Sequence, residues 1–119
     1  MKDFSEVFAR LRDTLRPYAE SLDCTVDSDE QLSLDTRHMQ KNKQPLWFGG
    51  VQIKKRYVSY HLMPVYVNPD LLADLSPELR KRMQGKSCFN FTTVDEGLFS
   101  ELADLTEAAF ADYRRQGFV

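Results

Sequence analysis

His61 and the residues around it are the part of the sequence whose types and spacing could support chemistry. A histidine titrates near neutral pH and can serve as a general base or as a metal ligand. Ser59 lies two residues away on the same face of a predicted strand, and Cys88 could approach through the fold, which would place a nucleophile beside a base. The other histidine, His38, lies in a polar segment, and the chain holds no GxSxG or HExxH motif. A half-buried, hydrogen-bonded histidine is therefore the simpler interpretation.

A dense basic group forms a second candidate site. It consists of Arg80-Lys81-Arg82 together with Lys86. Such cations could hold a phosphorylated or carboxylated ligand, although cations near the end of a short helix also interact favourably with the helix dipole. On the ligand-binding interpretation, the predicted anion site consists of Lys54, Tyr57, His61, Arg82 and Lys86.

Three acidic residues recur every seven positions in the first predicted helix. Glu6, Asp13 and Glu20 fall on the side opposite its apolar stripe. Hard cations, iron included, accept carboxylate oxygens, so these residues are the candidate ligands of a labile surface metal site. The alternative is a solvated helix face, which also places acids opposite the core stripe, and three arginines interrupt the series.

Two glycine-containing stretches invite comparison with ligand-binding loops. Gly85-Lys86-Ser87 matches the end of a phosphate-binding P-loop, but Arg80 stands where that motif needs its first glycine. A helix is also predicted before this stretch, where the motif requires a strand, so the P-loop is rejected. Gly49-Gly50 belongs to no longer glycine pattern, and we expect it to allow a β-bulge or the close approach of a neighbouring element.

Composition indicates a single compact domain spanning residues 1–119. The chain is 42% hydrophobic and has 14 aromatic residues, enough for one core without metal or disulfide support. Cys24 and Cys88 lie far apart and form no CxxC pair, which suits free thiols in a reducing cytoplasm. Neither a signal peptide nor a membrane-spanning run is expected. We therefore expect a soluble cytoplasmic protein.

Charge is distributed unevenly along the chain. The net charge of −2 conceals a basic middle segment, residues 51–88, with seven basic and three acidic residues, and an acidic end, residues 89–119, with two basic and six acidic residues. Such segregation can mark a binding face or surfaces that attract each other within the fold. An overall pI near 5.7 argues against binding to a nucleic-acid backbone.

The elements that must position these residues follow from the apolar periodicity. Residues 3–22 form a predicted helix that is kinked or broken at Pro17, because proline removes a backbone donor. Short strands are predicted for residues 24–26 and 31–35, and an exposed loop for residues 37–45.

The second half of the chain contains the main strands and three further helices. Strands are predicted for residues 46–54 and 56–66, and the core face of the second strand carries Val58, Tyr60, Leu62 and Tyr66. The capping side chains of Asn68 and Ser76, each followed by proline, predict short helices at 69–75 and 77–84.

A last strand and a long helix complete the predicted fold. The strand covers residues 88–91, and the helix covers residues 94–116, opened by a capping box of Thr93 and Glu96 and ended by Gly117. The predicted buried stripe of this helix consists of Leu98, Leu102, Leu105, Ala109 and Tyr113. The order α-β-β-β-β-α-α-β-α predicts an α+β domain with a mainly antiparallel sheet of about five strands and both terminal helices on one face.

Three segments together resemble a bacterial family, domain of unknown function 1801, which includes the YdhG-like proteins. They are Pro45–Lys55, Tyr57–Tyr66, and Leu75–Leu79 continued through Lys86–Phe91. The resemblance covers nearly the whole chain and implies a small α+β sandwich. Some YdhG-like members are described as frataxin-like intracellular iron chaperones, so the resemblance implies iron binding by acidic side chains of the first helix.

Three functions are consistent with these patterns. The first is a cytoplasmic binding or chaperone-like domain rather than an enzyme, with labile iron as its specific ligand. The second is a protein or enzyme that binds a small anion in the basic and aromatic pocket. The third is a protein-interaction module that uses the partly covered sheet face around Trp47.

Overall fold

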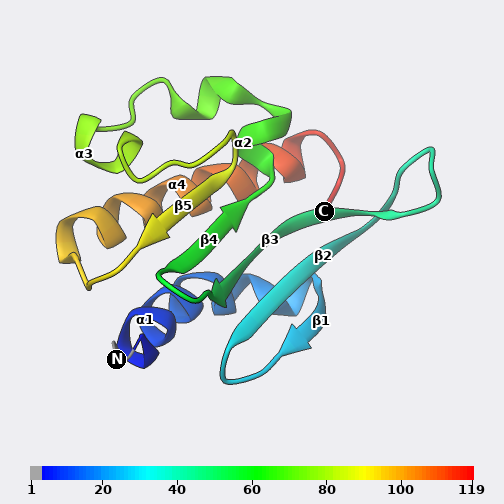
Figure 1. Ribbon diagram of the computed structural model, residues 1–119. Coiled ribbons are helices and arrows are strands. Elements are labelled where there is room, and N and C mark those ends of the chain that lie inside the picture. The colour runs from blue at the N-terminus through cyan, green and yellow to red at the C-terminus, as the bar shows by residue number, and fades with distance from the viewer. Residues whose placement is uncertain (1–3) are drawn as a thin grey trace.

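The structure is a computed structural model that describes residues 4–119, so Asp3, where the first helix was predicted to begin, lies outside the described residues. The fold is α+β, as predicted. Five antiparallel strands are hydrogen-bonded in chain order, and the N- and C-terminal helices pack on one face of this sheet (Figure 1). The elements are α1 (Ser5–Leu15), η1 (Arg16–Ser21), β1 (Asp23–Asp27), β2 (Gln31–Met39), β3 (Pro45–Ile53), β4 (Val58–Leu62), α2 (Pro64–Val67), η2 (Pro69–Leu72), α3 (Pro77–Arg80), β5 (Cys88–Phe91) and α4 (Glu96–Arg115).

The break predicted at Pro17 is confirmed. Helix α1 ends at Leu15, and the chain continues as the 3-10 helix η1. Pro17 lies in the first turn of η1, where a backbone N–H would have no acceptor within the helix, so proline removes no helical hydrogen bond there. Tyr18 of η1 reaches α4, where its ring centroid lies 4.9 Å from that of Phe110. The apolar stripe of α1 is buried as the spacing requires.

The β2–β3 hairpin is longer than the sequence indicates. Residues 37–45 were predicted to be a loop, but β2 continues to Met39 and β3 begins at Pro45, which leaves a turn of residues 40–44. The polar composition of this segment was misleading because the hairpin end projects from the rest of the sheet (Figure 1), and residues 37 and 39–45 are exposed there although several of them are paired as strand.

Gly49 and Gly50 allow the close approach of neighbouring strands that the sequence predicts as one alternative, and a β-bulge lies next to them at Phe48. Leu34 pairs with Gly49 and the next residue, Asp35, pairs with Trp47, so Phe48 is an extra residue on β3. A Cβ on Gly49 would lie 2.5 Å from the backbone oxygen of His61, and one on Gly50 would lie 2.7 Å from that of Leu32. Both positions therefore require glycine because neighbouring backbone lies too close for a side chain.

The connection between β4 and β5 differs from the prediction. Strand β4 ends at Leu62 rather than at residue 66, because Pro64 begins the short helix α2. Tyr66, assigned to the core face, is instead 54% exposed on α2. The capping roles of Asn68 and Ser76 are confirmed: each accepts a hydrogen bond from a backbone amide in the following turn, although both helices are shorter than predicted.

Helix α4 carries the predicted buried stripe but begins with another cap. Asp95, not Thr93, is the N-cap, and its carboxylate accepts a hydrogen bond from the amide of Leu98. Gly117, with a φ of +84°, ends the helix as predicted. None of the helices in residues 4–119 combines the length and apolar composition that crossing a membrane would require.

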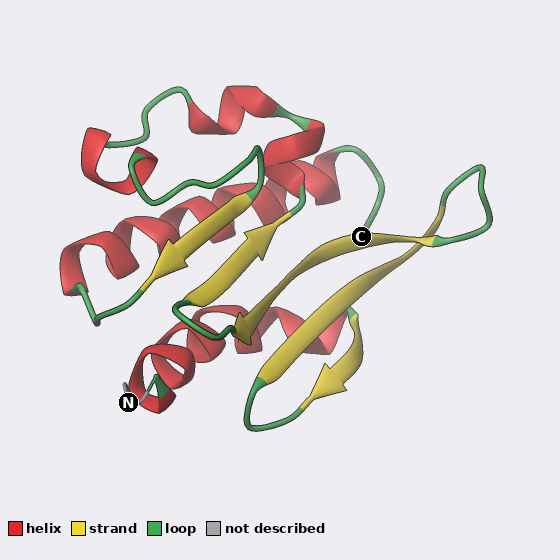
Figure 2. Cartoon of the chain, in the orientation of Figure 1, coloured by secondary structure: helices red, strands yellow, loops and turns green. Residues whose placement is uncertain are grey.

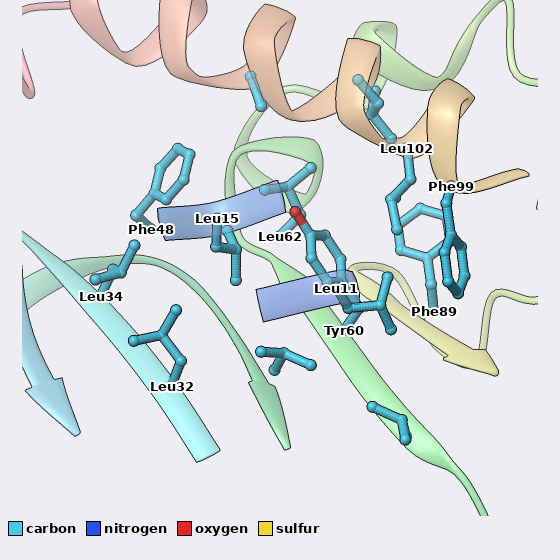
Figure 3. Close-up of a cluster of buried hydrophobic side chains, with 14 of the residues drawn as sticks. Leu11, Leu15, Leu32, Leu34, Phe48, Tyr60, Leu62, Phe89, Phe99 and Leu102 are labelled. Atoms are coloured by element: carbon cyan, nitrogen blue, oxygen red, sulfur yellow. The ribbon is translucent and has the colours of Figure 1, made fainter. Parts of the chain in front are cut away.

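The core lies between the sheet and the helices α1 and α4. Figure 3 shows Leu11 and Leu15 of α1, Tyr60 and Leu62 of β4, and Leu102 of α4 in one cluster. The helices α1 and α4 cover this face, whereas among residues 4–119 no helix lies across the other face of the sheet (Figure 2). Polar side chains therefore collect on the open face.

Candidate functional site

One row of paired residues crosses four strands on the open face of the sheet. Ser33 of β2 pairs with Gly50 of β3, Gly50 pairs with His61 of β4, and His61 pairs with Cys88 of β5. Paired residues on neighbouring strands point to the same face with Cβ atoms about 5 Å apart. The register therefore places the imidazole beside the thiol although 27 residues separate them.

Trp47 lies over the vacant position of Gly50 and fixes His61 from one side. An atom of the indole ring would be 3.2 Å from a Cβ on Gly50, so the missing side chain makes room for the ring. The indole Nε1–H donates to Ser33 Oγ at 3.0 Å, and the indole centroid lies 5.3 Å from that of His61. Trp47 is thus half-buried against its own sheet.

Ser59 joins the imidazole and the thiol. Its Oγ lies 2.8 Å from His61 Nε2 and 3.1 Å from Cys88 Sγ, and the direct distance from Sγ to Nε2 is 3.6 Å. Asn90 Oδ1 lies 3.3 Å from Cys88 Sγ, while the Asn90 amide nitrogen donates to Gln84 at 2.9 Å. We call Ser59, His61, Cys88 and Asn90 the sheet-face cluster.

The electrostatics of the sheet-face cluster favour a neutral imidazole. Burial lowers the pKa of His61 below its usual value, and the positive charge of Lys54 lowers this pKa further. A neutral imidazole with its proton on Nδ1 presents Nε2 as an acceptor for the hydroxyl proton of Ser59. The two distances therefore provide a hydrogen-bonded path from the thiol through Ser59 to the imidazole.

The same geometry does not suit acyl transfer. Ser59 is 1% exposed and lies beneath its neighbours. The strand that carries Ser59 and His61 is paired with β3 on one side and β5 on the other, so its backbone amides serve the sheet. An acyl-transfer site needs free amides or other donors aimed at a developing oxyanion.

A separate groove lies in the connection between β4 and β5. It has a cavity volume of about 600 Å³. Its walls are mainly apolar, and Arg80 and Lys86 bring positive charge to it. The Lys86 ammonium lies 5.8 Å from the centroid of the Tyr66 ring, and Arg80 donates to the backbone oxygen of Leu72 at 2.7 Å. The residues that line it are Val65, Tyr66, Pro69, Leu72, Arg80, Met83, Gly85 and Lys86.

Helix α4 anchors the segment that forms the groove. Asn68 donates to the buried carboxylate of Asp112 at 3.1 Å. Glu101 accepts from both the amide and the hydroxyl of Ser76, at 2.7 and 2.6 Å. These contacts hold the two helix starts of the connection against a rigid twenty-residue helix.

The five residues predicted for an anion site lie in different places. Lys86 lines the groove, His61 belongs to the sheet-face cluster, and Arg82 is exposed, with its backbone oxygen accepting from the amide of Asn90. Lys54 and Tyr57 close the β3–β4 turn through a 2.8 Å backbone hydrogen bond. This turn and the groove are at opposite ends of β4. At the usual rise of about 3.3 Å per residue, the strand between them is about 13 Å long.

The residues predicted for a metal site are exposed on different turns of α1 and η1. Glu6, Asp13 and Glu20 all face solvent, and the Asp13 carboxylate lies 3.8 Å from the guanidinium of Arg12. Across residues 4–119, no group of three or more histidine, cysteine, aspartate or glutamate side chains is arranged to hold a metal ion.

Sequence reasoning missed the groove. Tyr66 and Met83 were not among the candidate site residues. Tyr66 was assigned to the core face because the period-2 pattern extended the predicted strand through residue 66. The signal that could have revealed the change of direction is Pro64, which cannot continue a central strand. The contact between Ser59 and Cys88 depends on the register of β4 and β5, which the sequence does not state.

The chain matches no family model, no curated protein and no solved structure. The resemblance to domain of unknown function 1801 therefore stays a prediction.

Proposed function

We propose that this protein binds a small amphipathic anion, a molecule with a flat apolar body and one carboxylate, phosphate or sulfonate group. The observation that carries the proposal is the placement of Lys86 and Arg80 on an otherwise apolar groove. Among residues 4–119, those that line the groove include no acidic side chain, so its charge is positive. Its volume of about 600 Å³ falls in the range of small-molecule sites.

The walls and the cations have complementary roles in this proposal. Tyr66, Leu72 and Met83 provide the surface against which an apolar body loses contact with water. Lys86 and Arg80 provide donors for an anionic group. Lys86 already lies over the Tyr66 ring, so an apolar body that packs beside this ring brings its anionic group close to the ammonium.

The proposal is tested with two fluorescent probes that differ in charge. 1-Anilinonaphthalene-8-sulfonate has a fused aromatic body and one sulfonate, and N-phenyl-1-naphthylamine has the same body without the anion. We expect the native protein to bind the sulfonate more tightly than the neutral probe. Amide chemical shifts measured with the sulfonate should change around residues 64–86. Equal affinity for the two probes, or shifts elsewhere on the chain, would overturn the proposal.

Substitutions separate the charge from the apolar wall. Lys86→Ala should weaken sulfonate binding about tenfold, because a charge-assisted hydrogen bond contributes about 1.5 kcal/mol, and should leave the neutral probe unaffected. Tyr66→Ser should weaken both probes. The control is Lys81→Ala, which removes an equal charge from an exposed position outside the groove and should change neither affinity.

A further inference from the structure

We propose that Cys88 is a reactive thiol that exchanges with low-molecular-weight disulfides, with Ser59 and His61 receiving its proton. This site is separate from the groove and does not depend on the anion-binding proposal. The inference begins from a nucleophile and a base on one open face of the sheet, joined by a hydroxyl within hydrogen-bond distance of both.

The three side chains form a continuous proton path. The thiol of Cys88 can donate to Ser59 Oγ at 3.1 Å, and the Ser59 hydroxyl donates to His61 Nε2 at 2.8 Å. A thiol must lose its proton before its sulfur attacks, since the thiolate is the nucleophile. A positioned base within hydrogen-bond reach is the usual means of activating such a group.

The base is held in place from the side away from the thiol. Trp47 contacts the imidazole, and its Nε1–H is fixed by Ser33. Gly50 leaves the space that this arrangement needs. His61 is therefore confined between an aromatic ring on β3 and the thiol on β5, which keeps Nε2 directed toward Ser59.

The other cysteine provides an internal comparison. Cys24 on β1 is exposed. Each thiol lies near an oxygen that cannot take up a proton, the backbone oxygen of Val26 for Cys24 at 3.4 Å and Oδ1 of Asn90 for Cys88 at 3.3 Å. Cys88 also lies 3.1 Å from Ser59 Oγ, which leads to the imidazole. Cys88 is half-buried. Exposure alone would make Cys24 the faster of the two thiols, whereas the proton path would make Cys88 faster.

The exchange step balances without another reactant. Cys88 Sγ forms a bond to one sulfur of the disulfide, and the disulfide bond breaks with its electron pair on the other sulfur. The Cys88 proton passes to Ser59 Oγ as the Ser59 proton passes to His61 Nε2. The protonated imidazole then returns a proton through solvent to the departing thiolate. The products are a mixed disulfide on Cys88 and one free thiol.

The open face determines which disulfides fit. Helices do not cover it (Figure 2), and Cys88 is half-buried beside Ser59 and Asn90, whose side-chain oxygens lie 3.1 and 3.3 Å from its Sγ. A half-buried sulfur can be reached by a few heavy atoms rather than by a folded protein segment. Small disulfides with flexible or flat substituents are therefore the class of co-reactant.

The experiment follows the release of thiopyridone from 4,4′-dithiodipyridine. The Cys24→Ser variant reports on Cys88, and the Cys88→Ser variant reports on Cys24. We expect the folded Cys88 to react at least about tenfold faster than the folded Cys24, as assistance from a positioned base predicts. In guanidinium chloride the two rates should converge. A folded Cys88 that reacts as slowly as Cys24, or more slowly, would overturn the proposal.

Variants in the Cys24→Ser background test the proton path. Ser59→Ala and His61→Gln should each slow the reaction of Cys88 about tenfold or more. The matched control is Gln52→Ala, which changes the residue that pairs with Ser59 from β3 but has no part in the path. If Gln52→Ala slows the reaction as much as Ser59→Ala, general disturbance of the face explains the result and the proton path is wrong. With glutathione disulfide, intact mass should show one glutathionyl group on the protein and peptide mapping should place it on Cys88.

Discussion

The phenolic oxygen of Tyr60 and the hydroxyl oxygen of Thr106 lie 2.7 Å apart in the centre of the protein, joining β4 to α4 across 46 residues of sequence. Thr106 uses its single hydroxyl proton on the backbone oxygen of Leu102, at 2.8 Å. Tyr60 must therefore be the donor in the first bond. Both residues are fully buried, and burial raises the pKa of Tyr60 above its usual value.

The direction of these hydrogen bonds predicts unequal costs for two substitutions. Thr106→Val leaves the Tyr60 hydroxyl buried without an acceptor and should lower the free energy of unfolding by about 1–3 kcal/mol. Tyr60→Phe leaves Thr106 still bonded to Leu102 and should cost about 1 kcal/mol or less. Urea denaturation of the two variants makes the comparison. A larger loss for Tyr60→Phe would contradict the assigned direction.

Glycine at position 49 should be required for stability. An added Cβ would lie 2.5 Å from the backbone oxygen of His61, which cannot move without disturbing the sheet, so Gly49→Ala should cost about 1–3 kcal/mol. Gly97, in the first turn of α4, is the matched control. A Cβ added there would lie 3.6 Å from its nearest neighbour, a side-chain oxygen of Asp95, which is an ordinary contact distance. Gly97→Ala should stabilise the protein by about 0.5–1 kcal/mol. Thermal unfolding of both variants would show opposite changes in Tm, and changes of the same sign would contradict this account.

Asp112 should hold the segment that forms the groove in place on α4. Its buried carboxylate accepts from Asn68, from Gln116 and from Arg115. Asp112→Ala leaves the Asn68 amide without this acceptor and should lower the free energy of unfolding by about 2 kcal/mol.

The effect of Asp112→Ala should be greatest in one segment. Amide hydrogen exchange should increase most in residues 64–72, which Asn68 ties to α4. Asp104→Ala, at an exposed position on the same helix, should leave exchange there unchanged. A uniform increase over the whole chain would show that Asp112 supports the core instead of the groove.

His61 should titrate below the usual range of histidine. Burial lowers the pKa of its imidazole, and the positive charge of Lys54 from the β3–β4 turn lowers this pKa further. Imidazole NMR signals should give a pKa below about 6.5, the usual value. Lys54→Met should raise this pKa, although burial would still hold it low, and Lys55→Met should have a smaller effect. If the pKa of His61 is unchanged in Lys54→Met, the charge of Lys54 does not contribute to the low pKa and the assignment is wrong.

The low pKa of His61 also predicts how stability depends on pH. Below about pH 6.5 the unfolded state takes up a proton at this residue before the folded state does, so the contribution of His61 to the free energy of unfolding is lost as pH falls through the folded pKa. His61→Gln lacks this contribution. The difference in stability between the native protein and the variant should therefore decrease from pH 7 toward acid, and a constant difference would contradict the assignment.

Local patterns in the sequence determined the elements and their core faces. The stripe of α1, the break at Pro17, the caps at Asn68 and Ser76 and the stripe of α4 follow from helix periodicity and backbone chemistry within a few residues. The strand at residues 88–91 and the antiparallel α+β arrangement are also as predicted. Pro64 was the exception: its effect on β4 was local, but the alternation of apolar residues around it masked the end of the strand.

Only the tertiary structure decided which side chains meet. Ser59 reaches Cys88 because β5 pairs with β4 in one particular register, and a shift of a single residue would turn Cys88 to the core. The groove exists because a connection of short helices is anchored on α4, and Lys86 is thereby separated from Lys54 by the length of β4. Elements depend on interactions between near neighbours in the chain, whereas sites depend on strand register and helix docking, which the burial of the whole core sets at once.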